Sequence, residues 1–488
     1  MAVVIQIVRS GSSDAAIVGR QLCLGEMMMK RQHAQLVGLI FVGLVLAGLP
    51  KATFAAEADK PTVEEPWQPA GLNGIRPIGS WRKPPQEVST ASPEDVAAWR
   101  KLKFGLFIHW SPVCVEGTEI GWSRAGHRRG LPWTWNILSG QVPVEVYDNL
   151  YKKFNPTQFD AREWVQVAKD AGTKYLVFTT KHHDGFSMFD TKLSDYKITS
   201  PESPYGRDIV RPLADACHEA GILWGIYYSQ VDWYHPDYMN CQDGHERYLA
   251  FLHGQLRELL TNYGKVSMIF FDGLSGDAKD WDAPTLINMC RELQPNVIIN
   301  DRAGVPADNS TPEQVIGRMD TERPWESCIT IGTQWTWKPN ERVKSLKECI
   351  QTLVRVVGGD GNLLLNVGPT PDGRIEPDQA ERLREMGRWL AKYGESIYDT
   401  RGGPFVTGQW GAATWRDRTI YVHVLDGGAA PLVLPPIARK IVSHRVLTGG
   451  KATVDQTDES ITITLADDAR NDVDTIVVLQ LDGPAVGE

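Results

Sequence analysis

The sequence predicts an α/β fold in which a (β/α) TIM-like barrel of parallel strands precedes a small antiparallel β domain. Between residues 95 and 402, short runs of branched and aromatic residues alternate with helical stretches, as in βα units around a parallel sheet. The predicted strands end in polar residues, at the end of a barrel where active sites lie. From 403 to 488, apolar residues recur with period two, which indicates antiparallel strands. We therefore predict a catalytic barrel at 95–402 and a β domain at 403–488.

Six segments of the first region are predicted to be buried strands, because each is short, apolar and rich in branched or aromatic residues. They are residues 104–110, 174–180, 222–229, 265–271, 296–302 and 361–369. The predicted helices cover 95–100 (capped by Ser92), 162–171, 209–220, 246–263, 284–293, 345–357 and 376–393. A regular barrel has eight strands, so either this one is irregular or two strands lie unseen within 112–150 and 314–340. Strands of the second region are predicted at 419–425, 441–447, 460–465 and 475–481.

The first 58 residues have the features of a secretory signal preceded by extra residues. Two basic residues precede an apolar run at 36–49 that is too short to span a bilayer comfortably, and small residues at 53–58 suit a signal peptidase. The sequence thus predicts a secreted or periplasmic protein, with a retained membrane anchor as the alternative. Residues 59–94, rich in Pro and charged residues, are predicted to be an N-terminal linker.

The composition argues against some classes of partner. With 42% hydrophobic and 23% charged residues the chain is globular, and its net charge of −9 disfavours nucleic acid and anionic membrane surfaces. Its 17 Trp residues tilt the interpretation only slightly toward carbohydrate, because such rings also fill cores. The cysteines beyond the leader show no CxxC spacing and no zinc pattern, so we expect mostly free, buried thiols.

The apolar run at 265–271 leads directly into Asp272 and Gly273. A glycine lets the backbone turn sharply, so this carboxylate is expected at the tip of a rigid core strand. In a parallel barrel, that position faces the active site. The plainer alternative is a strand that ends in an ordinary Asp-Gly turn.

Glycoside hydrolysis requires two carboxyl groups that flank the bond to be broken. Asp272 is the candidate for attack on the anomeric carbon or for activation of water. The acid that protonates the departing oxygen is sought in the loop after the strand at 296–302, where Glu313 and Glu326 both qualify. Trp325 could desolvate the neighbouring Glu326 and raise its pKa, although each Glu also fits an ordinary structural role.

Histidines at two other strand ends fit a sugar pocket better than a metal site. His182 and His183 follow the strand at 174–180, and His109 lies at the end of the first strand. A metal site of the amidohydrolase type requires a His-x-His pair on the first strand, and His109 stands alone there, so no metal is predicted. Neutral imidazoles and carboxylates are good hydrogen-bonding partners for vicinal hydroxyl groups.

Four further residues are expected at the rim of this pocket: Tyr227, Tyr228, Trp233 and Arg302. Since successive side chains of a strand point to opposite faces, only one of the two tyrosines should point inward, and the sequence leaves open which one. Arg302 would orient a substrate oxygen or the nucleophile. Core packing is the alternative role for each aromatic residue.

Several motifs spread over residues 98–400 carry a family resemblance. They are FGLFIHW at 104–110, KHHDGF at 181–186, YYS at 227–229 with DW at 232–233, FDG at 271–273 and NLLLNVGP at 362–369. In this order and combination, the chain resembles the α-L-fucosidases of glycoside hydrolase family twenty-nine. The resemblance implies a (β/α) barrel with a C-terminal β-sandwich, hydrolysis of terminal α-L-fucosyl linkages with retention, and no cofactor.

Position by position, the resemblance implies that Asp272 is the nucleophile that forms a covalent fucosyl intermediate. The substrate-binding residues it implies are His109, His182, His183, Arg302 and either Tyr227 or Tyr228. The acid/base varies in position within the family; Glu313 lies nearest the expected distance after the strand tip at 300–302, with Glu326 in reserve. The family's usual Glu-Trp pair is not evident within 112–150, where Gly121-Trp122-Ser123-Arg124 stands in its place.

The sequence therefore predicts a retaining exo-α-L-fucosidase that acts on a fucosylated oligosaccharide or polysaccharide. Three alternatives stay open: a related retaining glycosidase for an L-galactose-like sugar, a catalytically silent fucose-binding protein, and a metal hydrolase. A panel of aryl glycosides, trapping with a fluorinated fucoside, and treatment with a chelator distinguish these alternatives in turn.

Overall fold

The computed structural model describes residues 87–130, 140–240, 244–274, 276–427 and 430–486. The leader predicted at 1–58 and most of the linker predicted at 59–94 lie outside the described residues. All described residues belong to one compact unit, Pro66–Glu488. Within the described part of the chain, no helix is both long enough and apolar enough to cross a membrane.

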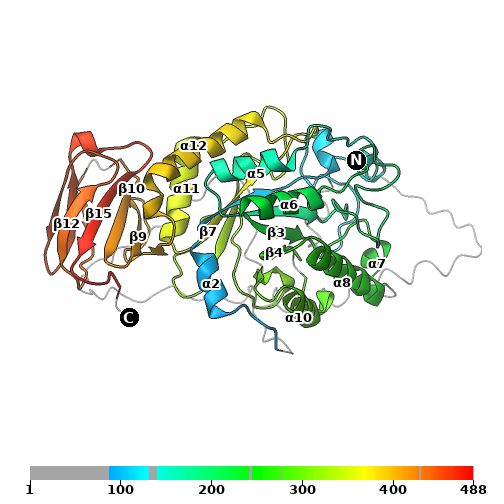
Figure 1. Ribbon diagram of the computed structural model, residues 1–488, viewed down its shortest axis with the longest axis horizontal. Coiled ribbons are helices and arrows are strands. Elements are labelled where there is room, and N and C mark those ends of the chain that lie inside the picture. The colour runs from blue at the N-terminus through cyan, green and yellow to red at the C-terminus, as the bar shows by residue number, and fades with distance from the viewer. Residues whose placement is uncertain (1–86, 131–139, 241–243, 275, 428–429, 487–488) are drawn as a thin grey trace, which may run out of the picture. The chain divides into compact units, whose positions relative to one another are not determined.

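A seven-stranded parallel sheet forms the centre of this unit, in the order β5-β4-β3-β2-β1-β7-β6 (Figure 1). Its strands are β1 Phe104–Ile108, β2 Tyr175–Lys181, β3 Leu223–Tyr228, β4 Met268–Phe271, β5 Ile298–Ile299, β6 Glu326–Thr330 and β7 Asn362–Val367. Six of them match the predicted strands, and β6 is one of the two that the sequence left unseen. No strand is found in the described part of 112–150, and residues 131–139 of that range lie outside the described residues.

The two edge strands of the sheet, β5 and β6, are connected through the segment 309–314. Isolated parallel bridges join Asn309 to the residue after β5, Asn300, and join the segment to β6 at Glu313 and Cys328. Pro312 lies in this segment and has no N–H to donate, so the ladder is interrupted and no regular eighth strand forms. The predicted (β/α) barrel is thus confirmed in its irregular form.

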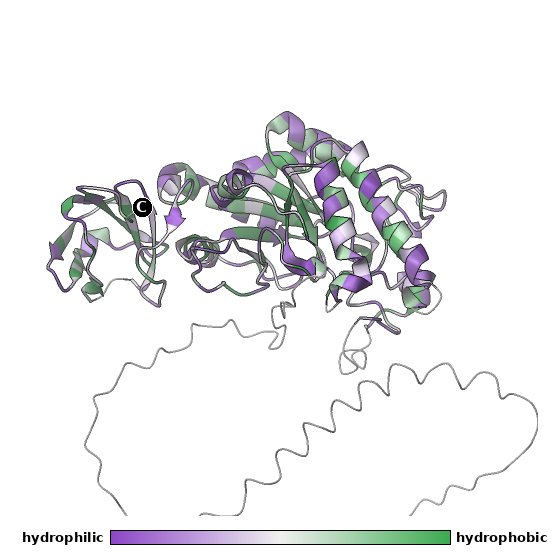
Figure 2. Ribbon diagram, turned by 90° about the horizontal axis from the view of Figure 1, so that it is seen from below, coloured by the Kyte–Doolittle hydropathy of each residue, from purple (hydrophilic) through white to green (hydrophobic). Residues whose placement is uncertain are grey.

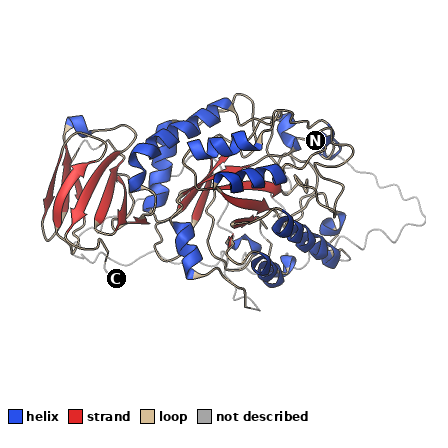
Figure 3. Cartoon of the chain, in the orientation of Figure 1, coloured by secondary structure: helices blue, strands red, loops and turns tan. Residues whose placement is uncertain are grey.

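Helices follow the strands and surround the sheet (Figure 3). The long ones are α2 Pro93–Arg100, α5 Ala161–Asp170, α6 Val210–Ala220, α8 His245–Asn262, α10 Ala283–Leu293, α11 Leu346–Gly358 and α12 Pro377–Tyr393, and short ones are α4 Val144–Tyr147, α7 Pro236–Met239 and α9 Ala278–Trp281. The seven predicted helices are all present, and the Ser92 side chain caps α2 by accepting from the Asp95 N–H at 3.0 Å. Figure 2 shows why they were predictable: hydrophobic and hydrophilic residues share each helix, whereas the central strands are mainly hydrophobic.

The C-terminal region consists of antiparallel strands around a separate apolar core. One sheet has the order β12-β15-β10-β9-β8 and the other the order β11-β14-β13. The strands are β8 Arg401–Gly402, β9 Gly411–Arg416, β10 Thr419–Val424, β11 Leu432–Leu434, β12 Ile441–Val446, β13 Ala452–Gln456, β14 Ile461–Leu465 and β15 Thr475–Leu481. The predicted β-sandwich is confirmed, with four more strands than the period-two pattern revealed.

The cysteines within the described residues are free and buried, as predicted: Cys114, Cys217, Cys290, Cys328 and Cys349. Cys241 lies outside the described residues.

Candidate active site

The carboxyl ends of four neighbouring strands bring five of the predicted site residues together. His109 follows β1, His182 and His183 follow β2, Tyr227 lies near the end of β3, and Asp272 follows β4. The ring centroid of His182 lies 5.8 Å from that of His109, 4.1 Å from that of His183 and 5.3 Å from that of Tyr227. Because the strands are parallel, polar residues at their carboxyl ends lie together at one end of the barrel.

The Asp272 carboxylate is held in one orientation by three neighbours. The Tyr227 hydroxyl donates to Oδ2 at 2.8 Å, Arg302 Nη1 donates to Oδ1 at 3.1 Å, and His183 Nε2 lies 3.5 Å from Oδ2. Its own backbone N–H donates to the Gln230 side chain at 2.9 Å. The side chain is 11% exposed, so the carboxylate is largely shielded from solvent.

Of the two candidate tyrosines, Tyr227 faces the Asp272 carboxylate. The Tyr228 hydroxyl donates instead to Gln255 of α8 at 2.8 Å, and the Lys181 ammonium lies 4.7 Å from its ring. Adjacent residues of β3 point to opposite faces. The prediction that included Tyr228 among the substrate-binding residues is therefore wrong, and Tyr227 is the pocket residue.

Arg302 contacts both Asp272 and a second carboxylate, that of Glu313. Its Nη1 atom lies 3.1 Å from Asp272 Oδ1 and 2.9 Å from Glu313 Oε2. The two oxygens share one nitrogen as neighbour, so they cannot be further apart than these two contacts allow. The two oxygens therefore lie at most 6.0 Å apart, which is compatible with the separation of about 5 Å between the carboxyl groups of a retaining glycosidase.

The environment of Glu313 favours its protonated form. Burial raises the pKa of this carboxyl group, Arg302 lowers it again, and the nearby Asp272 charge raises it. A raised pKa allows a carboxylic acid to donate a proton near neutral pH. Among the two acids predicted for this role, Glu313 is the one that lies beside Asp272.

Glu326 lies at the other end of the barrel. It is the first residue of β6, not part of a loop as predicted, and it is 4% exposed. Its carboxylate accepts a hydrogen bond from the hydroxyl of Tyr175, the first residue of β2. Burial raises its pKa to about 7. The structure does not bring it to Asp272, so Glu326 is wrong as a candidate acid/base.

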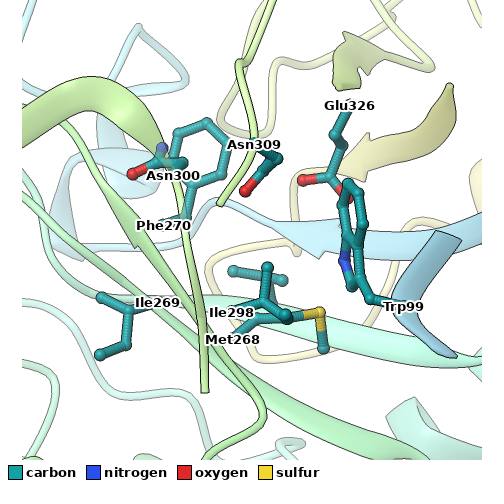
Figure 4. A pocket seen from close by; sticks show the side chains of 9 residues that line it. Trp99, Met268, Ile269, Phe270, Ile298, Asn300, Asn309 and Glu326 are labelled. Carbon is teal, nitrogen blue, oxygen red and sulfur yellow. The ribbon is translucent and has the colours of Figure 1, made fainter. Parts of the chain in front are cut away.

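Glu326 borders a small cavity of about 10 Å³ (Figure 4). The cavity is lined by Trp99, Val177, Met268, Ile269, Phe270, Ile298, Asn300, Asn309 and Glu326. The Trp99 Nε1 atom has no hydrogen-bond partner among the described residues. Neither Asp272 nor Glu313 lines this cavity, so it is distinct from the Asp272 site.

The three histidines are neutral, and their hydrogen bonds assign a tautomer to one of them. Asn366 uses its amide N–H to donate to the Trp335 carbonyl at 2.8 Å, so its oxygen accepts from His109 Nδ1 at 2.7 Å. His109 Nε2 is then left as an acceptor. Burial lowers the pKa of His109 to about 3 and holds the pKa of both His182 and His183 well below the usual value. These rings can therefore exchange hydrogen bonds with hydroxyl groups at neutral pH.

Trp233 packs against the ring of His183. It is buried, its ring centroid lies 5.2 Å from that of His183, and its indole N–H donates to the Arg129 carbonyl at 3.1 Å. Trp122 packs edge-on against both His183 and Trp233, at 5.7 and 5.6 Å, and is partly exposed. Trp122 belongs to the stretch that stands in place of the family's usual Glu-Trp pair.

Sequence reasoning missed Trp335 and Glu119. The partly exposed Trp335 ring lies 4.7 Å from the His109 ring, between centroids. The Glu119 carboxylate accepts from the backbone N–H groups of Trp335 at 2.8 Å and Ile120 at 3.0 Å, which joins two loops over the site. Burial raises the pKa of Glu119 to about 7. Both residues lie outside the predicted strands, and no local pattern identifies them.

His182, His183 and Asp272 could also hold a metal ion, because their ligand atoms lie within 4.8 Å of one another. The Arg302 guanidinium, 3.1 Å from Asp272, already places a positive charge on that carboxylate. A second cation there would be repelled, which favours a sugar-binding role for the histidines. The absence of a metal stays a prediction.

The Alpha-L-fucosidase family model matches residues 82–395 of the chain. The chain belongs to the α-L-fucosidase family. It is 30% identical to human plasma α-L-fucosidase over 331 residues, which cover 62% of this chain and 69% of that one. In sequence and fold, the family resemblance proposed from the motifs is therefore confirmed.

Solved α-L-fucosidases share the whole architecture. Isoenzyme 1 of Paenibacillus thiaminolyticus is 33% identical, with a TM-score of 0.70 over 80% of this chain and 99% of that one. An enzyme of Bacteroides thetaiotaomicron, solved as a trapped covalent intermediate, is 27% identical, with a TM-score of 0.71 over 82% of this chain and 98% of that one. As a member of this family, the chain is a glycoside hydrolase.

Proposed function

We propose that this α-L-fucosidase hydrolyses terminal α-L-fucosyl linkages with retention, with Asp272 as nucleophile and Glu313 as acid/base. The observation that carries the proposal is the shared Arg302 Nη1 atom, which lies within 3.1 Å of one carboxylate and 2.9 Å of the other. These contacts keep the two oxygens within 6.0 Å of each other, closer than the roughly 6.5–9.5 Å between the carboxyl groups of inverting enzymes.

In the first step, an Asp272 oxygen forms a bond to the anomeric carbon as the bond to the departing oxygen breaks. Glu313 gives its proton to that oxygen. In the second step, Glu313 takes a proton from water, the water oxygen attacks the anomeric carbon, and the Asp272 carboxylate is released. Arg302 and the Tyr227 hydroxyl hold Asp272 in place through both steps.

The neutral imidazoles of His109, His182 and His183 support binding of a small sugar with adjacent hydroxyl groups. A fucosylated oligosaccharide or polysaccharide is the proposed substrate, as the family resemblance implies. A sugar such as L-galactose could use the same contacts, and a protein that only binds fucose would keep the same histidines. Initial rates on a panel of aryl α-glycosides distinguish these possibilities, and we expect the α-L-fucoside to be the best substrate.

The proposed mechanism is tested by following hydrolysis of an aryl α-L-fucoside by proton NMR. Retention requires the α anomer of L-fucose to form first and the β anomer to appear only later by mutarotation. Initial formation of the β anomer would overturn the double displacement. Binding of fucose without any turnover would overturn the enzymatic assignment.

We also propose that the protein is secreted or periplasmic. The support is the basic and apolar leader pattern at 1–58 with small residues at 53–58. N-terminal sequencing of protein from the host's extracellular or periplasmic fraction should give a start after residue 55 or 58. An intact leader in a membrane fraction would favour the anchor instead.

A further inference from the structure

The Arg302 guanidinium uses all five of its N–H donors. Nε donates to Thr311 Oγ1 at 2.8 Å, and Nη2 donates to the Thr311 carbonyl at 3.0 Å and faces Cys328 Sγ at 3.9 Å. Nη1 contacts Asp272 at 3.1 Å and Glu313 at 2.9 Å. Thr311 therefore accepts hydrogen bonds from Nε and Nη2, the two nitrogens that do not face the carboxylates.

The segment 309–314 places Thr311 beside Arg302 because β5 ends early. One edge of the segment pairs with β6 through the backbone of Ser310, Pro312 and Gln314. On the other edge, the chain turns away after β5 into the 3₁₀ turn Asp301–Ala303, so no strand lies opposite Thr311. In place of a neighbouring strand, the Arg302 side chain donates to the Thr311 carbonyl. Thr311 and Glu313 are two residues apart and lie on the same face.

We propose that Thr311 is a positioning residue that sets the in-plane rotation of Arg302 and, through it, the separation of Asp272 and Glu313. The inference rests on the proposed function, since it concerns the same two carboxylates. Thr311 itself touches neither of the groups that react.

Packing alone does not fix the guanidinium in this way. The Phe270 ring lies 5.0 Å from the Arg302 Cζ atom, and such stacking fixes the plane of the guanidinium but permits rotation within it. The two Thr311 acceptors remove that rotation, because a planar fork bound at Nε and Nη2 has one orientation. Nη1 is then aimed between the carboxylates. Without the Thr311 hydroxyl, one buried N–H loses its partner and the fork can turn.

The test replaces Thr311 with Val, which has the same shape but no hydroxyl. We expect kcat on an aryl α-L-fucoside to fall about tenfold to a hundredfold with KM nearly unchanged, the size expected for one hydrogen bond to a charged group. Arg302 lowers the pKa of Glu313, so a loosened Arg302 should move the alkaline limb of the kcat/KM profile to higher pH. Thr311→Ser, which keeps the hydroxyl, should restore both values to near wild type.

A matched control separates positioning from a general loss of stability. Thr173 is also buried, and its hydroxyl donates to the Ala168 carbonyl at 2.8 Å, before β2 begins and far along the strand from the site. Thr173→Val should lower the thermal unfolding temperature without moving the pH profile. In an Arg302→Lys background, which has no Nε–H, Thr311→Val should change kcat by no more than about twofold.

A Thr311→Val enzyme with wild-type kcat and an unmoved alkaline limb would overturn the positioning role. So would a Thr311→Ser enzyme as impaired as the Val variant. Both results presuppose a wild-type enzyme that hydrolyses the fucoside, so they leave the proposed function standing. Failure of the wild type itself on every α-L-fucoside would overturn the proposed function instead.

Discussion

Each end of the barrel holds a glutamate whose pKa is raised, but the two glutamates have different surroundings. At the carboxyl ends of the strands, Glu313 shares the Arg302 nitrogen with Asp272. At the amino ends, Glu326 accepts from the Tyr175 hydroxyl and borders a small, mainly apolar cavity. Burial raises the pKa of both carboxyl groups. A buried acid with a raised pKa is therefore not by itself a catalyst; a second carboxylate within reach distinguishes the two ends.

The direction of the strands explains why Glu313 lies beside Asp272 and Glu326 does not. Glu326 begins β6, whereas Asp272 follows the last residue of β4. In a parallel sheet, these positions lie at opposite ends of the strands, whatever the local sequence around each acid suggests. The following predictions test this contrast between the two ends.

Replacement of Asp272 should have the largest effect. Asp272→Ala removes the proposed nucleophile, so kcat on an aryl α-L-fucoside should fall by roughly 10⁴-fold or more. Folding should be intact, because the side chain lies at the edge of the pocket and Glu313 still pairs with Arg302. Thermal unfolding and far-ultraviolet circular dichroism check the fold. Near-wild-type turnover would remove Asp272 from the mechanism.

The two glutamates should differ next. Glu313→Gln cannot donate a proton, so kcat/KM on a fucoside with a poor alcohol leaving group should fall by about 10²–10⁴-fold. The loss should be smaller for an acidic phenol, which departs without help. Glu326→Gln is the matched control at the other end, and it should stay within about twofold of wild type on both substrates. Equal losses for the two variants would contradict the contrast.

Glu326 should instead affect stability in a pH-dependent way. Burial raises its pKa from 4.5 to about 7, so the folded chain binds this proton more tightly than the unfolded chain does. Its contribution to stability therefore grows as the pH falls from about 7 toward 4.5, and the ionised form at higher pH costs up to about 3 kcal/mol.

Glu326→Gln removes this cost and can still accept from Tyr175. The variant should be more stable than wild type at pH 8 and about equally stable at pH 4.5. Urea unfolding at the two pH values measures the difference. A variant that is less stable at pH 8 would show that the carboxylate is better accommodated at this end than the cavity suggests.

Removal of metal ions should have the smallest effect. The histidine and aspartate atoms at the site are close enough to bind a cation, but Arg302 already neutralises Asp272. We expect dialysis against a chelator to leave kcat unchanged, and added Zn²⁺ to give no increase. Loss of activity that a metal restores would assign the cluster to a metal instead.

Much of the fold could be predicted, because most strands are uninterrupted apolar runs. Strand β6 was hidden since Glu326, Ser327 and Thr330 make most of its five residues polar. The short β5 could not be foreseen either, because the turn that follows it depends on the segment 309–314.

The site was predictable where a residue directly follows such a run, as Asp272 and His109 do. Which tyrosine points toward Asp272 depends on the orientation of β3, which the sequence does not give; the structure shows that it is Tyr227 and not Tyr228. Trp335 is held by Glu119, which is 216 residues away in the chain, and no local pattern reports a contact at that distance.

The most direct test of the Asp272–Glu313 pair is to trap the intermediate. Wild-type enzyme is incubated with 2-fluoro-fucosyl fluoride, digested, and analysed by peptide mass spectrometry. The 2-fluoro-fucosyl mass should be found on Asp272 and should be absent from the Asp272→Ala variant. A label on Glu313 or Glu326, or turnover of the reagent that never labels Asp272, would contradict the account.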